Sequence, residues 1–597
     1  MRRIAGAALA LTVTLLGGCD PKLPDYPKAD KTVWLDQNWQ AAQRNWYHHA
    51  DQGTMTFGVP YEWLAALEQP SLSLWAAGSF IDPAYLDQFG FIPSPDKDNP
   101  SGLPVGFAHG GPVIDPTTGQ VWINPQSKLP FTATGLTCAA CHTGRMTYNK
   151  TELLIDGGGA MTDLGKFRTA LGLSIAYTIY LPFRADRFAD RVLGPNASPE
   201  ARDALKKKLA DLLTSGKAAL ALDDNVKATS IEEGFGRLDA LNRIGNQVFA
   251  LDLAIDENYV GTSAPVHYPH IWDSSWFDWV QYNASIMQPM VRNAGESLGV
   301  RSLINLTTTN NPKLPLFAST ANITNLVKME DDLAGKQPEA ATGFTGLKAP
   351  AWPADVLGPI DQAAAAKGAT LYAEMCQGCH LPPTKSPEFW DAQYWTEPNA
   401  AGERYLKVTE VLITHIGTDP AQAAGMEYRG LRLPDALGIP ASDNDSYGPA
   451  LGAVVEKAVN QWYDSQNPPV PPEQRAKMNG NRPNKLQVEP LYKARPLDGI
   501  WASPPYLHNG SVPNVYALLS PAKERPTKFY LGRREYDPVN LGYQSQELAG
   551  GFEFDTTIPG NRNIGHEFDD APKGGGIIGR RLTPDERHAL VEYLKTL

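Results

Sequence analysis

Four of the five cysteines of the chain lie in two short motifs of the form Cys-x-x-Cys-His, which are Cys138-Ala-Ala-Cys141-His142 and Cys376-Gln-Gly-Cys379-His380. Two thiols three positions apart can bond to the two vinyl groups of one haem, and the next residue then places an imidazole at the iron. A thioredoxin-like redox pair, a structural zinc site and chance are the alternatives. Because the chain has so few cysteines and histidines, chance does not account for two copies. The first motif (138–142) and the second motif (376–380) therefore predict two covalently bound haem c groups, with His142 and His380 as iron ligands.

The fifth cysteine, Cys19, ends a different pattern at the start of the chain. Arg2 and Arg3 precede an apolar run from Ile4 to Leu16, and two glycines separate this run from Cys19. Charged, apolar and small residues in this order are typical of an export signal. Small residues directly before a cysteine resemble the lipobox of bacterial lipoproteins, and an ordinary signal peptide with an incidental cysteine is the alternative. The pattern predicts a protein of the bacterial periplasm that is anchored to a membrane by a lipid on Cys19.

Composition limits the class of protein and its partners. The 597 residues are 42% hydrophobic and carry a formal net charge of -12, which argues against a nucleic acid partner. No later apolar run approaches the ~20 residues that a membrane span needs. We expect a globular protein beyond the signal segment.

The second motif has the surroundings of a small haem domain. Residues 360–375 read as a helix that leads directly into Cys376, with Asp361 as its cap. The chain ends in a helix that begins with a capping box at Thr583-Pro-Asp-Glu586. Both helices resemble those that open and close a class I cytochrome c domain.

The first motif is placed differently, after a loop rich in proline, glycine and threonine. Apolar spacing predicts helices over 164–180, 199–222 and 231–254. We therefore predict a mainly α fold with two cytochrome c-like haem domains and long, irregular, loop-rich insertions. The predicted divisions are a lipoprotein signal peptide at 1–18, an N-terminal haem domain with the active site at 19–345, and a C-terminal cytochrome c domain at 346–597.

The sixth ligand of each iron decides what each haem does. A second strong-field ligand makes an electron carrier, whereas an open position lets dioxygen or peroxide bind. His566 and His508 lie in glycine-flanked loops of the second domain, the kind of loop that approaches a cofactor closely. The pair His48-His49 reads as surface.

An aromatic cluster with nearby charges lies between the two motifs. It contains Trp276 and is followed by Arg292 and Glu296. The cluster reads either as a domain core or as a haem pocket that excludes water. Peroxide chemistry needs a group that moves a proton and a cation that helps to break the O–O bond. Trp276, Arg292 and Glu296 are the candidate catalytic residues beside His142.

Taken together, these segments resemble the RoxA-type rubber oxygenases, a branch of the di-haem cytochrome c peroxidase and MauG superfamily. The resemblance rests on the separation of the motifs and on four segments, which are Trp276-Phe-Asp-Trp279 to Glu296, Tyr492-Lys-Ala-Arg-Pro-Leu-Asp-Gly-Ile-Trp501, Pro-Tyr-Leu-His508-Asn-Gly, and Gly565-His566-Glu-Phe.

The resemblance implies that His142 is the only protein ligand of an open, reactive haem. It also implies that His380 and His566 together hold a second, electron-relaying haem. His508 would lie near a haem or its propionates and is the next choice as ligand. Characterised rubber oxygenases are secreted, so the predicted lipid anchor argues against polyisoprene as the substrate.

Three functions follow from these expectations. The first is a haem-dependent oxidoreductase that uses peroxide or dioxygen, with a small apolar substrate and a protein that donates or accepts electrons. The second is a non-catalytic electron-transfer cytochrome for a membrane partner, which would need both irons to be six-coordinate. The third is a haem-based sensor, which a second covalent haem disfavours.

Overall fold

The computed structural model describes residues 21–73, 75–94, 99, 101–115, 120–307, 314–440 and 446–597. The predicted signal peptide, residues 1–18, and the predicted lipid-bearing Cys19 lie outside the described residues.

The protein mixes helices with many small sheets. The prediction of a mainly α fold built from two cytochrome c-like domains is therefore wrong, because 38% of the structure is helix and 14% is strand. All but one of the sheets described have only two strands. Eleven of the fifteen described strands have four residues or fewer, too few to show a clear alternating pattern in the sequence.

The α-helices of the described residues are α2 (Ala41–His49), α3 (Tyr61–Ala66), α4 (Pro83–Asp87), α5 (Leu164–Tyr180), α6 (Arg184–Leu193), α7 (Pro199–Asn225), α8 (Ala240–Gly245), α9 (Pro289–Gly299), α10 (Ile323–Ala334), α11 (Ala354–Leu357), α12 (Gln362–Met375), α13 (Gln377–His380), α14 (Ile413–Ile416), α15 (Ala421–Tyr428), α17 (Tyr447–Ser465), α18 (Pro472–Met478), α19 (Val515–Leu518) and α20 (Pro584–Leu594). The strands are β1 (Lys31–Trp34), β2 (Phe107–Pro112), β3 (Thr132–Leu136), β4 (Thr143–Tyr148), β5 (Thr151–Asp156), β6 (Arg237–Leu238), β7 (Val266–His267), β8 (Thr409–Leu412), β9 (Leu491–Ala494), β10 (Lys528–Leu531), β11 (Tyr536–Asp537), β12 (Gly542–Tyr543), β13 (Phe552–Asp555), β14 (Glu567–Phe568) and β15 (Ile577–Gly579).

Helices with strong local signals form where the sequence predicts them. The helix expected over 164–180 is α5, and the helix expected over 199–222 is α7, which runs on to Asn225. The capping box of α20 is present, with Thr583 and Glu586 each bonded to the other's backbone amide. Of the helix expected over 231–254, only α8 and a following π-helical segment (Asn246–Asp252) form.

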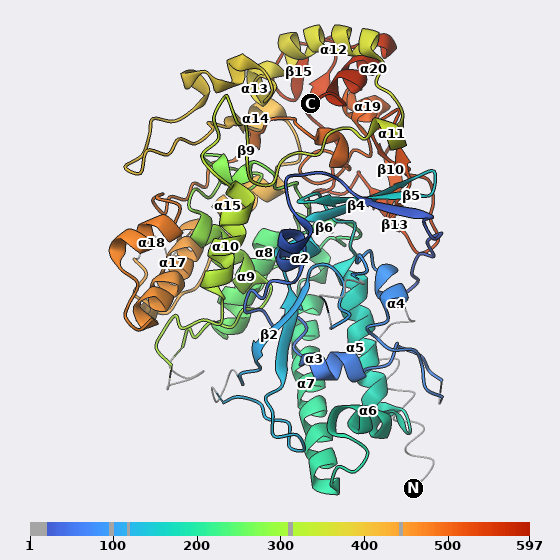
Figure 1. The fold of residues 1–597 in the computed structure, drawn as a ribbon, viewed down its shortest axis with the longest axis vertical. Helices are drawn as coiled ribbons and strands as arrows, with labels where there is room; N and C mark the ends of the chain where they lie inside the picture. The colour runs from blue at the N-terminus through green and yellow to red at the C-terminus, as the bar shows by residue number, and fades with distance from the viewer. Residues whose placement is uncertain are drawn as a thin grey trace.

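The second motif is supported by a close helix pair. α12 ends directly before Cys376, and α20 packs across it at the opposite end of the molecule from α5, α6 and α7 (Figure 1). The helices touch at Gly368, where a Cβ would lie only 2.1 Å from the carbonyl oxygen of Ala589. This contact needs a residue without a side chain, so glycine at 368 sets the separation of the two helices.

The first motif is supported by the one three-stranded sheet in the described part of the chain. Its strand order is β1-β5-β4, with β5 parallel to β1 and antiparallel to β4. β4 starts directly after His142, and its first residue, Thr143, pairs with the buried Asp156 of β5. The sheet therefore fixes the backbone that leaves the first motif.

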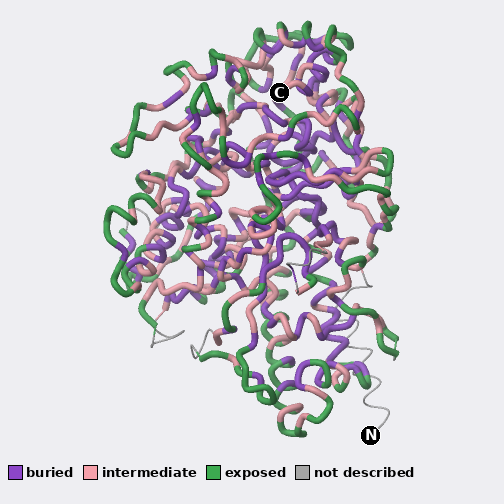
Figure 2. The backbone as a smooth tube through the Cα atoms, viewed as in Figure 1, coloured by how far each residue is buried: buried purple, intermediate pink, exposed green. Residues whose placement is uncertain are grey.

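Contacts cross the predicted domain boundary at residues 345 and 346. The amide of Thr147 donates to the carbonyl of Arg534 at 2.6 Å, and α9 packs against α17. One hydrophobic core includes Leu35 near the start of the chain and Leu597 at its end. Figure 2 shows this buried chain running through the middle of the molecule. The boundary itself stays a prediction. Among the described helices, none combines the length and apolar character that a membrane crossing requires.

Candidate functional site

The first motif forms a tight turn that presents His142. Thr137 caps the turn by accepting from the amide of Ala139 at 3.3 Å, and the amide of His142 donates to the carbonyl of Cys138 at 2.9 Å. His142 Nδ1 lies 2.8 Å from the carbonyl oxygen of Pro269. A carbonyl acceptor fixes the proton on Nδ1 and leaves Nε2 as the nitrogen that can bind a metal. Burial lowers the pKa of His142 to about 4, which keeps the imidazole neutral.

The second motif repeats this arrangement on a different support. α12 delivers Cys376, and the amide of His380 donates to the carbonyl of Cys376 at 2.8 Å. His380 Nδ1 lies 2.8 Å from the carbonyl oxygen of Arg495. Both motif histidines thus have the backbone acceptor on Nδ1 that metal-binding histidines commonly show.

His566 faces His380. Their ring centres lie 6.2 Å apart with 61° between the ring planes. The amide of His566 donates to the carbonyl of Ile416 at 2.9 Å, and Arg525 donates to the carbonyls of Gly565 and His566 at 2.9 and 3.0 Å. Burial, with the charges of His380 and Arg525, lowers the pKa of His566 to about 3. The loop therefore presents a neutral imidazole, the form that binds a metal.

The spacing of these two rings fits one iron between them. Metal–imidazole bonds are about 2 Å long and a ring centre lies about 1 Å behind its nitrogen, so two imidazoles on one metal have centres about 6 Å apart. In addition, Nδ1 of His566 is buried without a hydrogen-bond partner among the described residues. His380 and His566 fit the haem group that the second motif predicts.

Arg237, beside the first motif, is a second residue whose surroundings suit a bound haem. Its guanidinium is fully buried, and Nε and Nη1 have no hydrogen-bond partner in the described part of the chain, while Nη2 donates to Asn561 at 2.6 Å. Its partner across the β6–β7 pair is His267, whose buried Nε2 is also unpartnered and lies 2.8 Å from where a Cβ of Gly159 would be. Because a buried charge needs a partner, these donors fit a carboxylate such as a haem propionate.

His508 lies on the first-motif side of the molecule. Its ring stacks on Tyr492 with 4.1 Å between ring centres, and its carbonyl accepts from the amide of His267 at 2.9 Å. Burial and the charge of Arg237 lower the pKa of His508 to about 3. The ring of His508 makes no contact with that of His380 among the described residues, so the structure brings His566 to the second motif and places His508 elsewhere.

Arg292 and Glu296 lie one turn apart on α9, in a charged group near the first motif. Arg292 forms an ion pair with Glu330 of α10. Gln281 donates to Glu296 at 2.8 Å. Burial raises the pKa of Glu296, although the Arg292 charge lowers it. Burial would also raise the pKa of Glu330, but Arg292 and hydrogen bonds bring it below its usual range. The group therefore holds one ionised carboxylate and one that takes up a proton more readily.

Burial raises the pKa of the thiols of both Cys138 and Cys141, and the negative charge of Glu296 raises each of these pKa values further. Trp276 is buried at the edge of the same region, where its Nε1 donates to the carbonyl of Ala334 at 2.7 Å and its ring packs against Tyr405. The described contacts of Trp276 are thus one hydrogen bond to the backbone and packing against a neighbouring ring.

Comparison with known proteins places the chain in a family. It is 61% identical over 575 residues to the uncharacterized protein y4iJ of Sinorhizobium fredii (strain NBRC 101917 / NGR234), covering 96% of this chain and 95% of that protein. The chain belongs to the y4iJ family. The uncharacterized protein y4iM of the same organism is 30% identical over 271 residues, which are 43% of this chain and 52% of y4iM.

In this member of the y4iJ family, residues 491–530 match a family model described as RoxA-like, cytochrome c-like. The match supports the relation to RoxA-like proteins, which are haem oxidoreductases, and implies haem binding. The matched segment contains Arg495, whose carbonyl holds His380, and His508. The wider superfamily stays a prediction.

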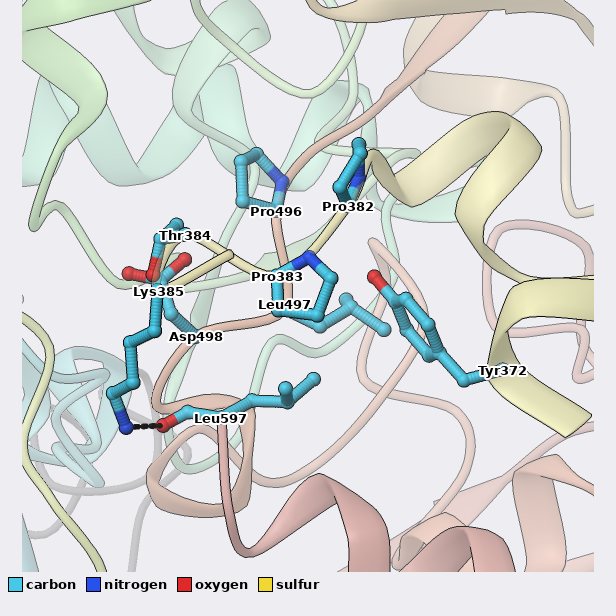
Figure 3. Close-up of a pocket in the computed structure, with 9 residues that line it drawn as sticks. All are labelled: Tyr372, Pro382, Pro383, Thr384, Lys385, Pro496, Leu497, Asp498 and Leu597. Carbon is cyan, nitrogen blue, oxygen red and sulfur yellow. Dashed lines mark hydrogen bonds between the residues drawn. The ribbon is translucent and has the colours of Figure 1, made fainter. Parts of the chain in front are cut away.

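A small pocket lies between residues that precede and follow the second motif in the chain, among them Tyr372 and Pro383 (Figure 3). Tyr372 lines one side of it and donates to the carbonyl of Leu381 at 2.8 Å. Lys385 on the other side reaches the carbonyls of Thr596 and Leu597, at 2.9 and 3.5 Å. These contacts attach the segment that follows His380 to the last residues of the chain.

Two groups beside the first motif were not predicted from the sequence. Glu330 stands in a run of acidic residues that reads as a solvated helix face. His48 was expected at the surface, yet it is 3% exposed and its Nε2 lies 2.8 Å from Asp156. Arg44 also bonds to Asp156. Since Asp156 is far from α2 in the chain, no local pattern could reveal this buried cluster.

Proposed function

We propose that the protein is a di-haem c-type oxidoreductase of the bacterial periplasm. Peroxide or dioxygen would react at a haem bound through Cys138 and Cys141, and a second haem, bound through Cys376 and Cys379, would relay electrons.

The observation that carries this proposal is the difference between the two motif histidines. His380 is faced by His566, whereas no ring of another residue is paired with His142 among the described residues. An iron with two imidazoles suits electron transfer, and an iron with one can bind a small oxidant. The two sites therefore support a division of labour between a relay and a reactive centre.

Haem bound at these motifs supplies one-electron chemistry and a place for dioxygen or peroxide. The chain's own residues bind and orient it. The cysteine sulfurs would form thioether bonds to haem, and Arg237 with His267 would bind a propionate, while the carbonyl of Pro269 holds the ring of His142.

Glu296 is placed to move a proton near the first motif. Its raised pKa makes a carboxyl that can take a proton and give it back, and the amide of Gln281 holds one of its oxygens. Arg292 adds a positive charge, kept in place by Glu330. These are the groups that cleavage of an O–O bond requires.

Partners and location follow the same proposal. A protein that donates or accepts electrons would exchange them with the second haem. The predicted lipid on Cys19 would hold the protein at a membrane, and a small apolar molecule suits the aromatic surroundings of the first motif as substrate.

The test compares electron paramagnetic resonance and optical spectra of the purified wild type and His566→Ala. His508→Ala is the matched control, because His508, like His566, is largely removed from solvent, and burial lowers the pKa of each histidine to about 3. We expect a high-spin component and a low-spin bis-histidine component in the wild type, with only the latter lost in His566→Ala. Two fully six-coordinate irons at every redox level would make the protein an electron carrier and refute the proposal.

A further inference from the structure

One arginine connects the two haem motifs. His142 Nδ1 lies 2.8 Å from the carbonyl of Pro269, and the carbonyl of the next residue, His270, accepts from Arg495 Nη1 at 2.6 Å. The backbone carbonyl of Arg495 in turn lies 2.8 Å from His380 Nδ1. These hydrogen bonds and the covalent bonds between them form a continuous path from one motif imidazole to the other.

Arg495 and His270, at the centre of this path, are each held by further contacts. Arg495 Nη2 donates to the carbonyl of Trp272 at 3.0 Å, so the guanidinium holds two carbonyls of one short segment. The ring of His270 stacks on that of Trp272 with 4.3 Å between centres, and its Nδ1 lies 2.9 Å from the hydroxyl of Ser503. A planar fork with several fixed donors suits such a link better than the single flexible amine of lysine.

We propose that Arg495 is a positioning residue that couples the two haem-binding histidines and completes the path along which an electron passes between the irons. This inference rests on the proposed function, because it needs a haem at each motif. One electron would leave the iron held by His380, which would be oxidised, and would reach the iron held by His142, which would be reduced. No bond is made or broken, and the transfer needs no further reactant.

The side chain of Arg495 can be tested separately from iron ligation. His380 is bonded to the backbone carbonyl of Arg495, and His142 is bonded to the carbonyl of Pro269. A substitution at 495 keeps both of these acceptors and removes the side-chain hydrogen bonds to the carbonyls of His270 and Trp272. Removal of a group hydrogen-bonded directly to a metal-bound histidine commonly changes activity by about 10- to 100-fold. The Arg495 side chain acts one residue further out, so we expect an effect at the lower end of this range.

The experiment follows one electron within the protein that carries both haems. A photochemically generated reductant reduces a small fraction of the molecules, and absorbance records how fast the electron equilibrates between the two haems. The variants are Arg495→Met and Arg495→Lys. Arg482→Met is the matched control, because Arg482 also donates to two neighbouring carbonyls, those of Phe277 (2.8 Å) and Asp278, but lies off the path.

We expect Arg495→Met to slow the exchange by about tenfold or more, with Arg495→Lys between it and the wild type. Arg482→Met should keep the wild-type rate, and every variant should keep the low-spin bis-histidine spectrum. A wild-type rate in Arg495→Met overturns the inference, and so does equal slowing in Arg482→Met. If Arg495→Met does not fold, Arg495→Lys decides in the same way. A wild type whose two haems never exchange an electron instead overturns the proposed function.

Discussion

The ring of His566 faces the ring of His380 across 6.2 Å, although the two residues lie in distant parts of the chain. The backbone directly before His566 allows this. Gly565 has φ +70°, and a Cβ at this position would lie 2.2 Å from the backbone carbon of Gly417. The position of the His566 ring thus depends on glycine at position 565, which has no side chain.

The variant Gly565→Ala should therefore displace His566 and abolish the low-spin bis-histidine signal. The left-handed conformation alone costs a residue with a side chain about 1–2 kcal/mol, and the collision with Gly417 adds to this. Paramagnetic resonance and thermal unfolding measure both effects. Gly425→Ala is the control, since Gly425 lies in α15 with open space around it and should tolerate alanine. An intact low-spin signal in Gly565→Ala would contradict the assigned role of this loop.

Glu296 offers a test of the reactive site. Glu296→Gln keeps an oxygen that can accept from Gln281 but cannot take up a proton, so turnover with peroxide should fall by roughly 10²- to 10⁴-fold. Because the pKa of Glu296 is raised, its carboxylate becomes protonated as the pH falls to this pKa and can no longer act as a base. Wild-type activity should fall over the same pH range. The variant should lack this acidic limb. Unchanged turnover with both haems in place would remove Glu296 from the mechanism.

Glu68 makes stability depend on pH far from either haem motif. Its carboxylate is 4% exposed and accepts from Arg187 at 2.7 and 2.9 Å and from Arg191 at 3.0 Å. Burial alone would raise its pKa, but the hydrogen bonds from Arg187 and from the amide of Ala77, with the charges of Arg184 and Arg187, lower the pKa from 4.5 to about 2. A lowered carboxyl pKa stabilises the fold above pH 4.5, and this contribution is lost as the pH falls towards 2.

Glu68→Gln should therefore cost about 3 kcal/mol of unfolding free energy near pH 7, the size expected when a buried ion pair loses one partner. Urea unfolding at a series of pH values measures the difference between wild type and variant. The difference should close as the pH falls below 4.5. If it stays constant down to pH 3, ionisation of Glu68 does not stabilise the fold.

Features encoded by neighbouring residues could be predicted from the sequence. The capping box at Thr583, the helix over 164–180 and the helix that leads into Cys376 all depend on contacts within a few residues. The two haem motifs are equally local. The opposing pair of His380 and His566 was anticipated only through a family resemblance, because a loop histidine carries no local sign of its partner.

Features that depend on distant contacts were missed. The pair β8–β9 joins 409–412 to 491–494, and neither segment alternates clearly enough to predict a strand. His48 of α2 is buried against Asp156 of β5, and the buried Arg237 contacts His267 and Asn561. In each case the partner that satisfies the side chain is remote in sequence, so residue type and spacing gave the wrong expectation or none.

Because His566 lies outside the second motif, covalent attachment of the second haem and coordination of its iron by a second imidazole would depend on different parts of the chain. The thioether bonds of the second haem would need only the motif at 376–380, whereas the second imidazole arrives from a loop near the end of the chain. A shortened or damaged protein could keep its haem through denaturation on a gel and still have lost the coordination that sets its redox potential. Under the proposed function, haem content would therefore not measure whether the relay site of this protein is correctly assembled, and each preparation would need a spectrum of its spin state.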